Sequence, residues 1–269
     1  MTAPAATVAR VPRSAPRRGV AAPAAVWALT LRGLRTGLRE GDLVFAMLSP
    51  IGFFLCFYTP LHRAFEAGGG RYAQYLLPVI VLQSGLFTAI TAAQVSGTDA
   101  RSAARDRFLT LPIPRVAPAA ARIVAAGLRV LISTAAACAI AAAFGFRFHG
   151  SAVDTVAFVV TVVALTVGLA MLCDALGSAV PNPDGVAQTL MIPQLVLVML
   201  STGLVPATAF PGWVQPFVEY QPVSVVADAL RGLAEGSPVR VAAAAAWIAV
   251  LLVGGALVIV AAGRREARR

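Results

Sequence analysis

The chain has 269 residues, of which 58% are hydrophobic and only 13% are charged, and its mean hydropathy is +0.79. A soluble domain carries about 25% charged residues, so this composition excludes an ordinary soluble globular enzyme. The net charge is +10 and every basic residue is arginine, because the chain contains no lysine. A phosphate-binding P-loop requires a lysine, so the chain carries no standard ATP-binding motif of its own.

The N-terminal region divides into two parts. Residues 1–23 are rich in alanine, proline and arginine, and we expect a disordered basic tail because such a segment cannot bury enough apolar surface to fold. It does not have the pattern of a signal peptide. In residues 24–41, Trp27, Leu31, Leu34 and Leu38 recur at helical spacing between arginines. This pattern predicts an amphipathic helix on the inner membrane surface, while a plain extension of the first span fits the same residues.

Six apolar segments are each long enough to cross a membrane, which takes about 20 mostly apolar residues. Alternating strands of about ten residues, which a transmembrane β-barrel needs, are absent from the sequence. The expected fold is an all-α polytopic membrane protein in which residues 24–269 form one transmembrane domain. We expect the spans at about residues 43–61, 75–96, 119–146, 153–176, 186–205 and 239–262.

The placement of the arginines predicts that both termini lie on the cytoplasmic side of a bacterial inner membrane. In this orientation fifteen arginines fall on the inner side and five on the outer side, as the positive-inside rule requires. This topology accounts for the basic charge, so we expect no nucleic-acid partner. The cysteines are isolated and neither histidine has the spacing of a metal site, so we expect no metal or cofactor in this chain.

The connection between the second and third spans, TDARSAARDRFLTLPIPR, places apolar residues on an otherwise charged inner segment. Ser96 and Asp99 can cap a short helix here, and Pro112 and Pro114 can end it. Such a helix can insert an apolar tip into a groove of a soluble partner, while a solvated loop that only fixes topology fits the composition as well. The residues proposed for the contact are Arg101, Arg105, Asp106, Phe108, Leu109 and Leu111.

Two arginines lie inside the third span, where a charge costs at least about 2.5–3.5 kcal/mol and usually faces a partner or water. Arg122 and Arg129 are seven residues apart, hence near one face of a helix, and Asp174 lies at similar depth in the fourth span. We predict an intramembrane ion pair of either Arg122 or Arg129 with Asp174. The alternative is that Arg122 reaches out to the inner headgroups.

The segment from Ser201 to Arg231, here called the outer block, is apolar enough for a membrane yet carries four prolines. Proline interrupts a straight helix, and broken backbone survives in a bilayer only inside protein or against water. We therefore expect the fifth span to break at residues 203–206 and to lead into short pieces at the outer surface. Its acids Glu219 and Asp228, and Glu235 shortly after it, are expected to be solvated. The residues that define its turns and depth are Pro206, Pro211, Gly212, Trp213, Pro216, Glu219 and Pro222.

Together, the six spans, the inner run RFLTLPIPR and the outer run STGLVPATAFPGWVQPFVEYQPVSVVADALRG resemble the membrane subunits of ABC type-2 exporters. The likeness is greatest to the actinobacterial group of daunorubicin-resistance and phthiocerol dimycocerosate exporter permeases. The run GFRF at residues 145–148 also resembles that group. The likeness extends from about Trp27 to Ala262.

The resemblance implies a transmembrane permease subunit whose energy comes from a separate ATPase, which binds ATP and Mg. It implies that two permeases form the pathway, as a homodimer or with a related subunit. Residues 24–41 would then be the connecting helix, residues 99–111 the coupling helix, and the outer block a re-entrant hairpin over the exit. The expected cargo is a hydrophobic or amphipathic drug, polyketide, lipid or polysaccharide, exported by alternating access.

Two other classes of membrane protein are open at this point. A secondary transporter requires paired broken helices in both halves of the chain, and only the fifth connection is clearly broken. An integral membrane enzyme acting on lipid-linked substrates requires clustered acids or histidines at one membrane face. The sequence shows no such cluster and no nucleophile motif, so we expect no catalytic activity in this chain.

Overall fold

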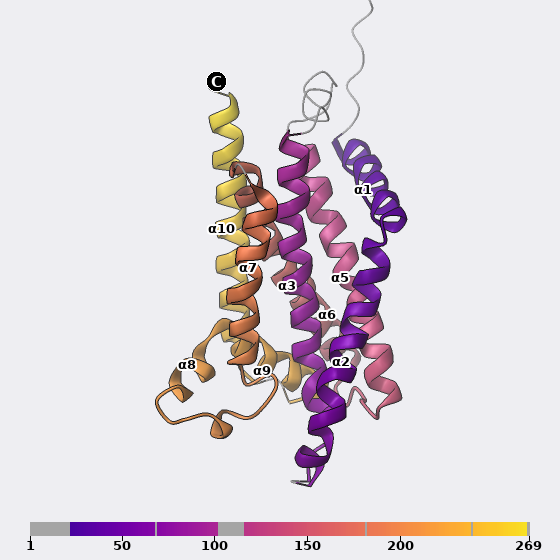
Figure 1. Cartoon of the computed structure of the whole chain (residues 1–269), viewed down its shortest axis with the longest axis vertical. Coiled ribbons are helices and arrows are strands. Elements are labelled where there is room, and N and C mark those ends of the chain that lie inside the picture. Colours follow the sequence, from indigo (N-terminus) through magenta and orange to yellow (C-terminus); the bar gives the residue numbers. More distant parts are fainter. Residues whose placement is uncertain (1–21, 68, 102–115, 181, 238, 268–269) are drawn as a thin grey trace, which may run out of the picture.

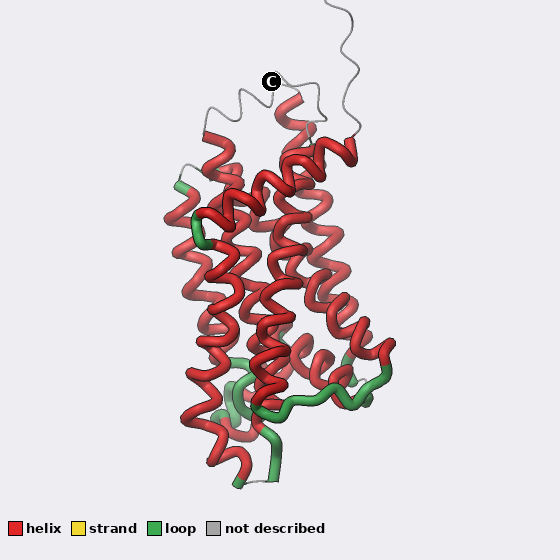
Figure 2. The backbone as a smooth tube through the Cα atoms, turned by 90° about the vertical axis from the view of Figure 1, so that its right-hand side faces the viewer, coloured by secondary structure: helices red, strands yellow, loops and turns green. Residues whose placement is uncertain are grey.

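The computed structural model describes residues 22–267, except for residues 68, 102–115, 181 and 238. Within these residues every regular element is a helix (Figure 2), which confirms the expected all-α membrane fold. The long helices are α1 (Ala22–Arg39), α2 (Asp42–Glu66), α3 (Tyr72–Arg101), α5 (Ala117–Ala143), α6 (Ala152–Ala179), α7 (Pro183–Met199) and α10 (Val241–Ala267). Three short helices, η1 (Ala207–Ala209), α8 (Gln215–Tyr220) and α9 (Pro222–Glu235), separate α7 from α10.

Helix α3 forms the centre of the bundle (Figure 1). It packs against α2, α5, α6, α7 and α9, and 83% of its most apolar stretch of 18 residues is buried. Gly177 of α6 lies directly against the Ala93 backbone of α3. Small residues at such a contact let two membrane helices approach closely.

Five helices, α2, α3, α5, α6 and α10, are long and apolar enough to cross a membrane. Helix α7 has 17 residues, and it is apolar but shorter than these five. It ends at Met199, earlier than the expected span at residues 186–205, and the Thr202 amide donates to the Ser224 hydroxyl of α9 at 3.1 Å instead of continuing a helix. A sixth crossing by α7 stays a prediction.

Helix α1 lies at an angle across one end of the bundle, beside α5 and α2 (Figures 1 and 2). The Thr30 hydroxyl lies 3.3 Å from the Ala121 carbonyl of α5, which it can bond. Gly41 turns the chain from α1 into α2 with φ 84°, a conformation that glycine adopts without strain. Residues 24–39 of the predicted segment therefore lie in a helix separate from the first span, and Glu40 and Gly41 form the turn after it. The expected tail lies outside the described residues except for Ala22 and Pro23, which begin α1.

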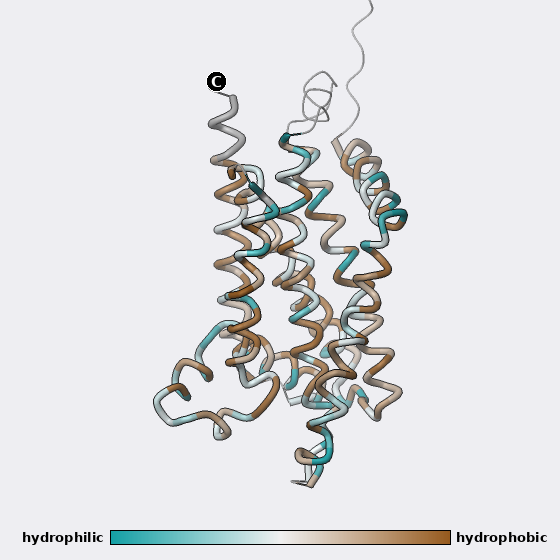
Figure 3. Tube along the Cα trace, in the orientation of Figure 1, coloured by the Kyte–Doolittle hydropathy of each residue, from teal (hydrophilic) through white to brown (hydrophobic). Residues whose placement is uncertain are grey.

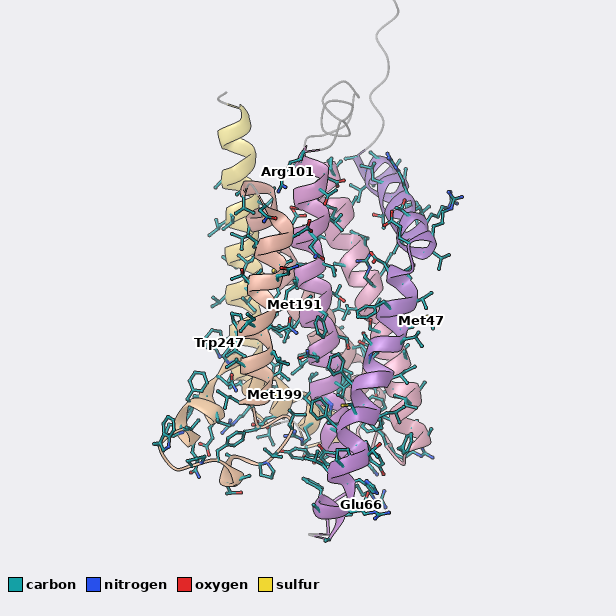
Figure 4. All side chains as sticks on the ribbon, in the orientation of Figure 1. Met47, Glu66, Arg101, Met191, Met199 and Trp247 are labelled. Carbon is teal, nitrogen blue, oxygen red and sulfur yellow. The ribbon has the colours of Figure 1, made fainter. Side chains whose placement is uncertain are left out.

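The two ends of the bundle differ in what they carry, and we name them from Figure 1. The upper end holds α1, the end of α10 and Arg101, and the lower end holds α8, α9 and Glu66 (Figures 1 and 4). Figure 3 shows hydrophilic residues along α1 and at the lower tip of α2, with a mainly hydrophobic middle.

Large apolar side chains point outward along the sides of the bundle. Met47 of α2, Met191 of α7 and Trp247 of α10 are 48%, 39% and 41% exposed (Figure 4). A soluble monomer rarely exposes a large contiguous apolar surface, so these sides require lipid or another apolar helix as a cover.

Candidate functional site

A buried ion pair joins α5 to α6 near the upper end. Arg122 Nε donates to Asp174 Oδ1 at 2.5 Å, and Arg122 Nη2 donates to Asp174 Oδ2 at 3.0 Å. The Asp174 side chain is only 4% exposed and that of Arg122 is 17% exposed. This two-point contact matches the planar fork of the guanidinium to the carboxylate, which makes the interaction strong and directional.

The same arginine connects the pair to α3. Arg122 Nη1 lies 3.3 Å from Asp99 Oδ2, and Ser96 Oγ donates to the Asp174 backbone carbonyl at 2.5 Å. We call Ser96, Asp99, Arg122 and Asp174 the upper charge cluster. Because its contacts join α5 to α6, α5 to α3 and α3 to α6, it holds the upper parts of three helices in one register.

Arg129 has other partners, although the sequence allows either arginine to reach Asp174. Its Nη2 lies 3.4 Å from Asp42 Oδ2 at the start of α2, and its Nη1 lies 3.4 Å from Thr91 Oγ1 of α3. Seven residues carry Arg129 about 10 Å along the helix from Arg122, which separates the two guanidinium groups in depth. The functional role of both arginines stays a prediction.

The prediction that Ser96 and Asp99 cap a new helix is wrong. Helix α3 runs through both residues to Arg101, and their side chains contribute to the upper charge cluster instead. Arg101 Nη2 donates to the Val180 carbonyl beyond α6 at 3.0 Å. The other residues proposed for contact with a soluble partner lie outside the described residues: Arg105, Asp106, Phe108, Leu109 and Leu111.

A cavity of about 540 Å³, here called the upper cavity, lies between α1, α3 and α5, next to the upper charge cluster. Leu29, Val95 and Ala125 supply apolar surface to its lining, one from each of these helices. Arg122 and Arg129 line it as well. Its volume falls within the range of about 300–1,000 Å³ that small-molecule sites occupy.

A second charged group holds α9 at the lower end, and we call Asp228, Arg231 and Arg240 the lower charge cluster. Asp228 Oδ1 accepts from Arg231 Nη1 at 2.8 Å, and Asp228 Oδ2 lies 3.3 Å from Arg240 Nη1. The Arg231 guanidinium stacks 3.8 Å above the Tyr75 ring of α3, and its Nη2 lies 3.3 Å from the Thr202 carbonyl.

The prediction that Asp228 is a solvated acid is therefore wrong, since its side chain is 22% exposed and paired with two arginines. The spacing of Asp228 and Arg231 by three residues could have indicated their contact, because such residues are neighbours on a helix. The contributions of Tyr75 and Arg240 come from other segments, so no local pattern could have indicated them.

The prolines of the outer block mark the boundaries of its short helices. Pro206 precedes η1, Pro216 lies in the first turn of α8, and Pro222 begins α9. Proline is tolerated in a first turn because the amide it lacks has no helical partner there. Pro211, Gly212 and Trp213 lie between η1 and α8.

Aromatic side chains project from this block. Trp213 is 85% exposed, Phe217 is 53% exposed and Tyr220 is 70% exposed. The backbone carbonyl of Glu219 accepts from Arg240 Nη1 at 3.0 Å, which ties α8 to the lower charge cluster. Insertion of this block into a membrane as a re-entrant hairpin stays a prediction.

The fold and the two charge clusters define a multi-pass helical membrane protein in which charged residues link helix ends. Residues 24–234 match the family model described as ABC-2 type transporter, and the chain belongs to this family.

Similar proteins in other bacteria are permeases. The chain is 30% identical to the doxorubicin resistance ABC transporter permease protein DrrB of Mycobacterium tuberculosis over 230 residues. This alignment covers 82% of this chain and 79% of that protein. It is 32% identical over 133 residues to the probable doxorubicin resistance ABC transporter permease protein DrrC of the same species, covering 49% and 48%. It is 28% identical over 196 residues to the daunorubicin resistance ABC transporter permease protein DrrB1 of Streptomyces coeruleorubidus, covering 73% and 69%.

These matches confirm the likeness to the actinobacterial permease group. The chain is the transmembrane permease subunit of an ABC exporter, a multi-pass protein of a bacterial inner membrane. Membership of this family also implies an ABC ATPase as its partner.

Proposed function

We propose that this permease moves a hydrophobic or amphipathic compound out of the cell, driven by ATP hydrolysis on a separate subunit. The observation that carries this proposal is the match of residues 24–234 to the ABC-2 family, joined with relatives named for doxorubicin and daunorubicin resistance. Those names favour an antibiotic among the possible cargoes. ATP and Mg²⁺ are held by the ATPase, because a chain without lysine cannot supply a standard P-loop.

In this proposal the upper end faces the cytoplasm, which places both termini inside. The exposed arginines of α1 and the arginine at the end of α3 support this orientation, because positive charge accumulates on the cytoplasmic side. The lower end then faces outward. The exposed aromatic rings of the outer block suit the outer headgroup layer, which supports its role as a re-entrant hairpin over the exit.

The pathway forms between two permeases, either two copies of this chain or this chain and a related subunit. The exposed apolar sides of α2 and α7 support this arrangement, because burial against a second subunit would cover them. Among the most exposed of these side chains are Phe45 and Leu48 of α2, and Ile192, Leu195 and Val196 of α7.

Coupling enters at the upper end, through residues 99–111, which begin in the last turn of α3. The described start of this segment supports the role, since Asp99 contacts Arg122 and Arg101 contacts the Val180 carbonyl. A displacement here would act on α3, α5 and α6 together. ATP shifts the conformational balance only through different affinities for the inward-open and outward-open states, as any such ligand must.

Deleting residues 106–111 while leaving the spans intact is expected to abolish ATP-driven transport and to weaken copurification of the ATPase about tenfold or more, since apolar anchor residues each contribute about 2 kcal/mol. The measurement is affinity purification from membranes with quantification of the retained ATPase, followed by transport in vesicles. Deleting residues 4–9 of the N-terminal region removes the same length and is the matched control. Undiminished copurification and transport after the first deletion would contradict the coupling role.

Among the described residues no contact favours the other two classes considered from the sequence, a secondary transporter and an enzyme acting on lipid-linked substrates. The family match opposes both, because it assigns the energy source to an ATPase partner.

A further inference from the structure

The upper cavity is lined by more acids than arginines. Four carboxylates and three guanidinium groups contribute to its lining: Glu40, Asp42, Asp99, Asp184, Arg32, Arg122 and Arg129. Two of the arginines are already engaged, since Arg122 binds Asp174 as well as Asp99 and Arg129 contacts Asp42. Asp174 lies behind the lining and adds a further negative charge. The net negative charge around the cavity is therefore greater than the lining residues alone supply.

Two of the lining acids form no ion pair in the described part of the chain. Glu40 follows α1 and Asp184 lies in the first turn of α7, and both side chains are exposed. Neither carboxylate forms an ion pair with any described arginine. Each can therefore receive a positive charge from a ligand without giving up an ion pair with a described arginine.

The rest of the lining suits the body of such a ligand. Small and apolar side chains of α3 and α5 leave room along the wall, including Ala92, Val95, Ala125 and Ala126. Thr88 and Thr91 add hydroxyl groups to the same lining. A compound with an apolar body and a cationic group matches this combination, because binding sites are mostly apolar with a few placed polar groups.

We propose that the upper cavity receives an amphiphile carrying a protonated amine before it is exported, an inference that rests on the proposed function above. The amine is attracted by the acidic lining, to which Glu40 and Asp184 contribute from separate segments, and the apolar body lies against the small residues of α3 and α5. With the upper end in the cytoplasm, the ligand enters between α1 and the bundle at the level of the inner leaflet. Arg32 of α1 lines the same cavity and has no acidic partner among the described residues, so it opposes the cation.

The test measures binding of doxorubicin, which carries a primary amine, to the full chain alone in phosphatidylcholine nanodiscs, with empty nanodiscs subtracted. The double substitution Glu40→Gln/Asp184→Asn is expected to weaken binding about tenfold, because it removes two attractive charges. Arg32→Gln is expected to tighten binding about twofold to threefold, because it removes a repulsive one. The control is Glu235→Gln at the lower end, which removes the same single charge as Glu40→Gln. It is expected to leave doxorubicin binding unchanged.

A neutral probe separates charge recognition from apolar adsorption. Doxorubicin acetylated at its amine is expected to bind the unaltered chain about tenfold more weakly than doxorubicin and to be insensitive to the double substitution. Equal binding of the two probes, or an unchanged dissociation constant in the double variant, would overturn the assignment of the cavity.

The outcomes for the cavity and for the exporter are distinguishable, because the binding test omits the ATPase. If binding is unaffected by the double substitution while ATP-driven transport proceeds, the cavity assignment fails and the proposed function stands. If the unaltered chain and its ATPase move no cargo, the proposed function fails whatever the binding result.

Discussion

Replacing Asp174 by alanine is expected to lower the free energy of unfolding by about 3 kcal/mol, because removing one partner of a buried ion pair leaves an uncompensated charge. Arg122 would keep only Asp99, which lies 3.3 Å away and has a side chain 38% exposed. That remaining contact sets the expected loss at the lower end of the range of about 3–5 kcal/mol for broken buried pairs. The effect is measured by thermal or denaturant unfolding of the purified chain in detergent.

Two further variants identify the cause of the loss. Asp99→Asn removes the more exposed carboxylate and is expected to cost less than about 1 kcal/mol. The double substitution Arg122→Met/Asp174→Leu removes both charges and is expected to recover most of the stability, because apolar residues of similar volume often replace a buried pair without loss. An Asp174→Ala chain as stable as the unaltered one would show that the upper charge cluster does not hold α3, α5 and α6 together.

Replacing Gly177 by alanine is expected to destabilise the chain by about 3 kcal/mol, at or above the upper end of the usual cost of inserting a methyl group into a packed core. A methyl group here would overlap the carbonyl oxygen and other backbone atoms of Ala93. Backbone atoms cannot turn aside as a flexible side chain can, so α3 and α6 would have to separate. The contact between Ser96 and the Asp174 carbonyl joins the same two helices and would be strained as well.

Gly254 of α10 provides the matched control. A methyl group at this position would meet no atom within 4 Å. Gly254→Ala is therefore expected to leave stability unchanged or to raise it by up to about 1 kcal/mol, because alanine favours a helix more than glycine does. Unfolding of both variants under one set of conditions gives the comparison. Equal stability of Gly177→Ala and Gly254→Ala would mean that α3 and α6 do not pack as closely as the structure shows.

Much of the fold could be predicted because membrane helices leave a strong signal in sequence. Apolar length alone indicated the positions of α2, α3, α5, α6 and α10. The helical spacing of Trp27, Leu31, Leu34 and Leu38 indicated α1, and Gly41 accounts for the turn that separates it from α2. The boundary of α7 could not be predicted, because the side chain of Ser224, which is distant in sequence, accepts the Thr202 amide.

The charged residues were harder to place because their partners depend on helix packing. Depth along the helix indicated that Asp174 could meet an arginine, yet it did not distinguish Arg122 from Arg129. Ser96 and Asp99 resemble capping residues in sequence, but the chain continues in a helix and their side chains face α6 and α5. The upper cavity was not visible in sequence at all, since its lining comes from segments that only folding brings together.

We propose that this chain converts ATP hydrolysis by a companion subunit into outward movement of cargo. The most direct measurement uses inside-out vesicles containing the permease alone, the ATPase alone, or both, and follows the accumulation of doxorubicin with and without ATP. On this proposal, accumulation is expected only when both subunits and ATP are present. Accumulation by the permease alone, without an ATPase, would contradict it.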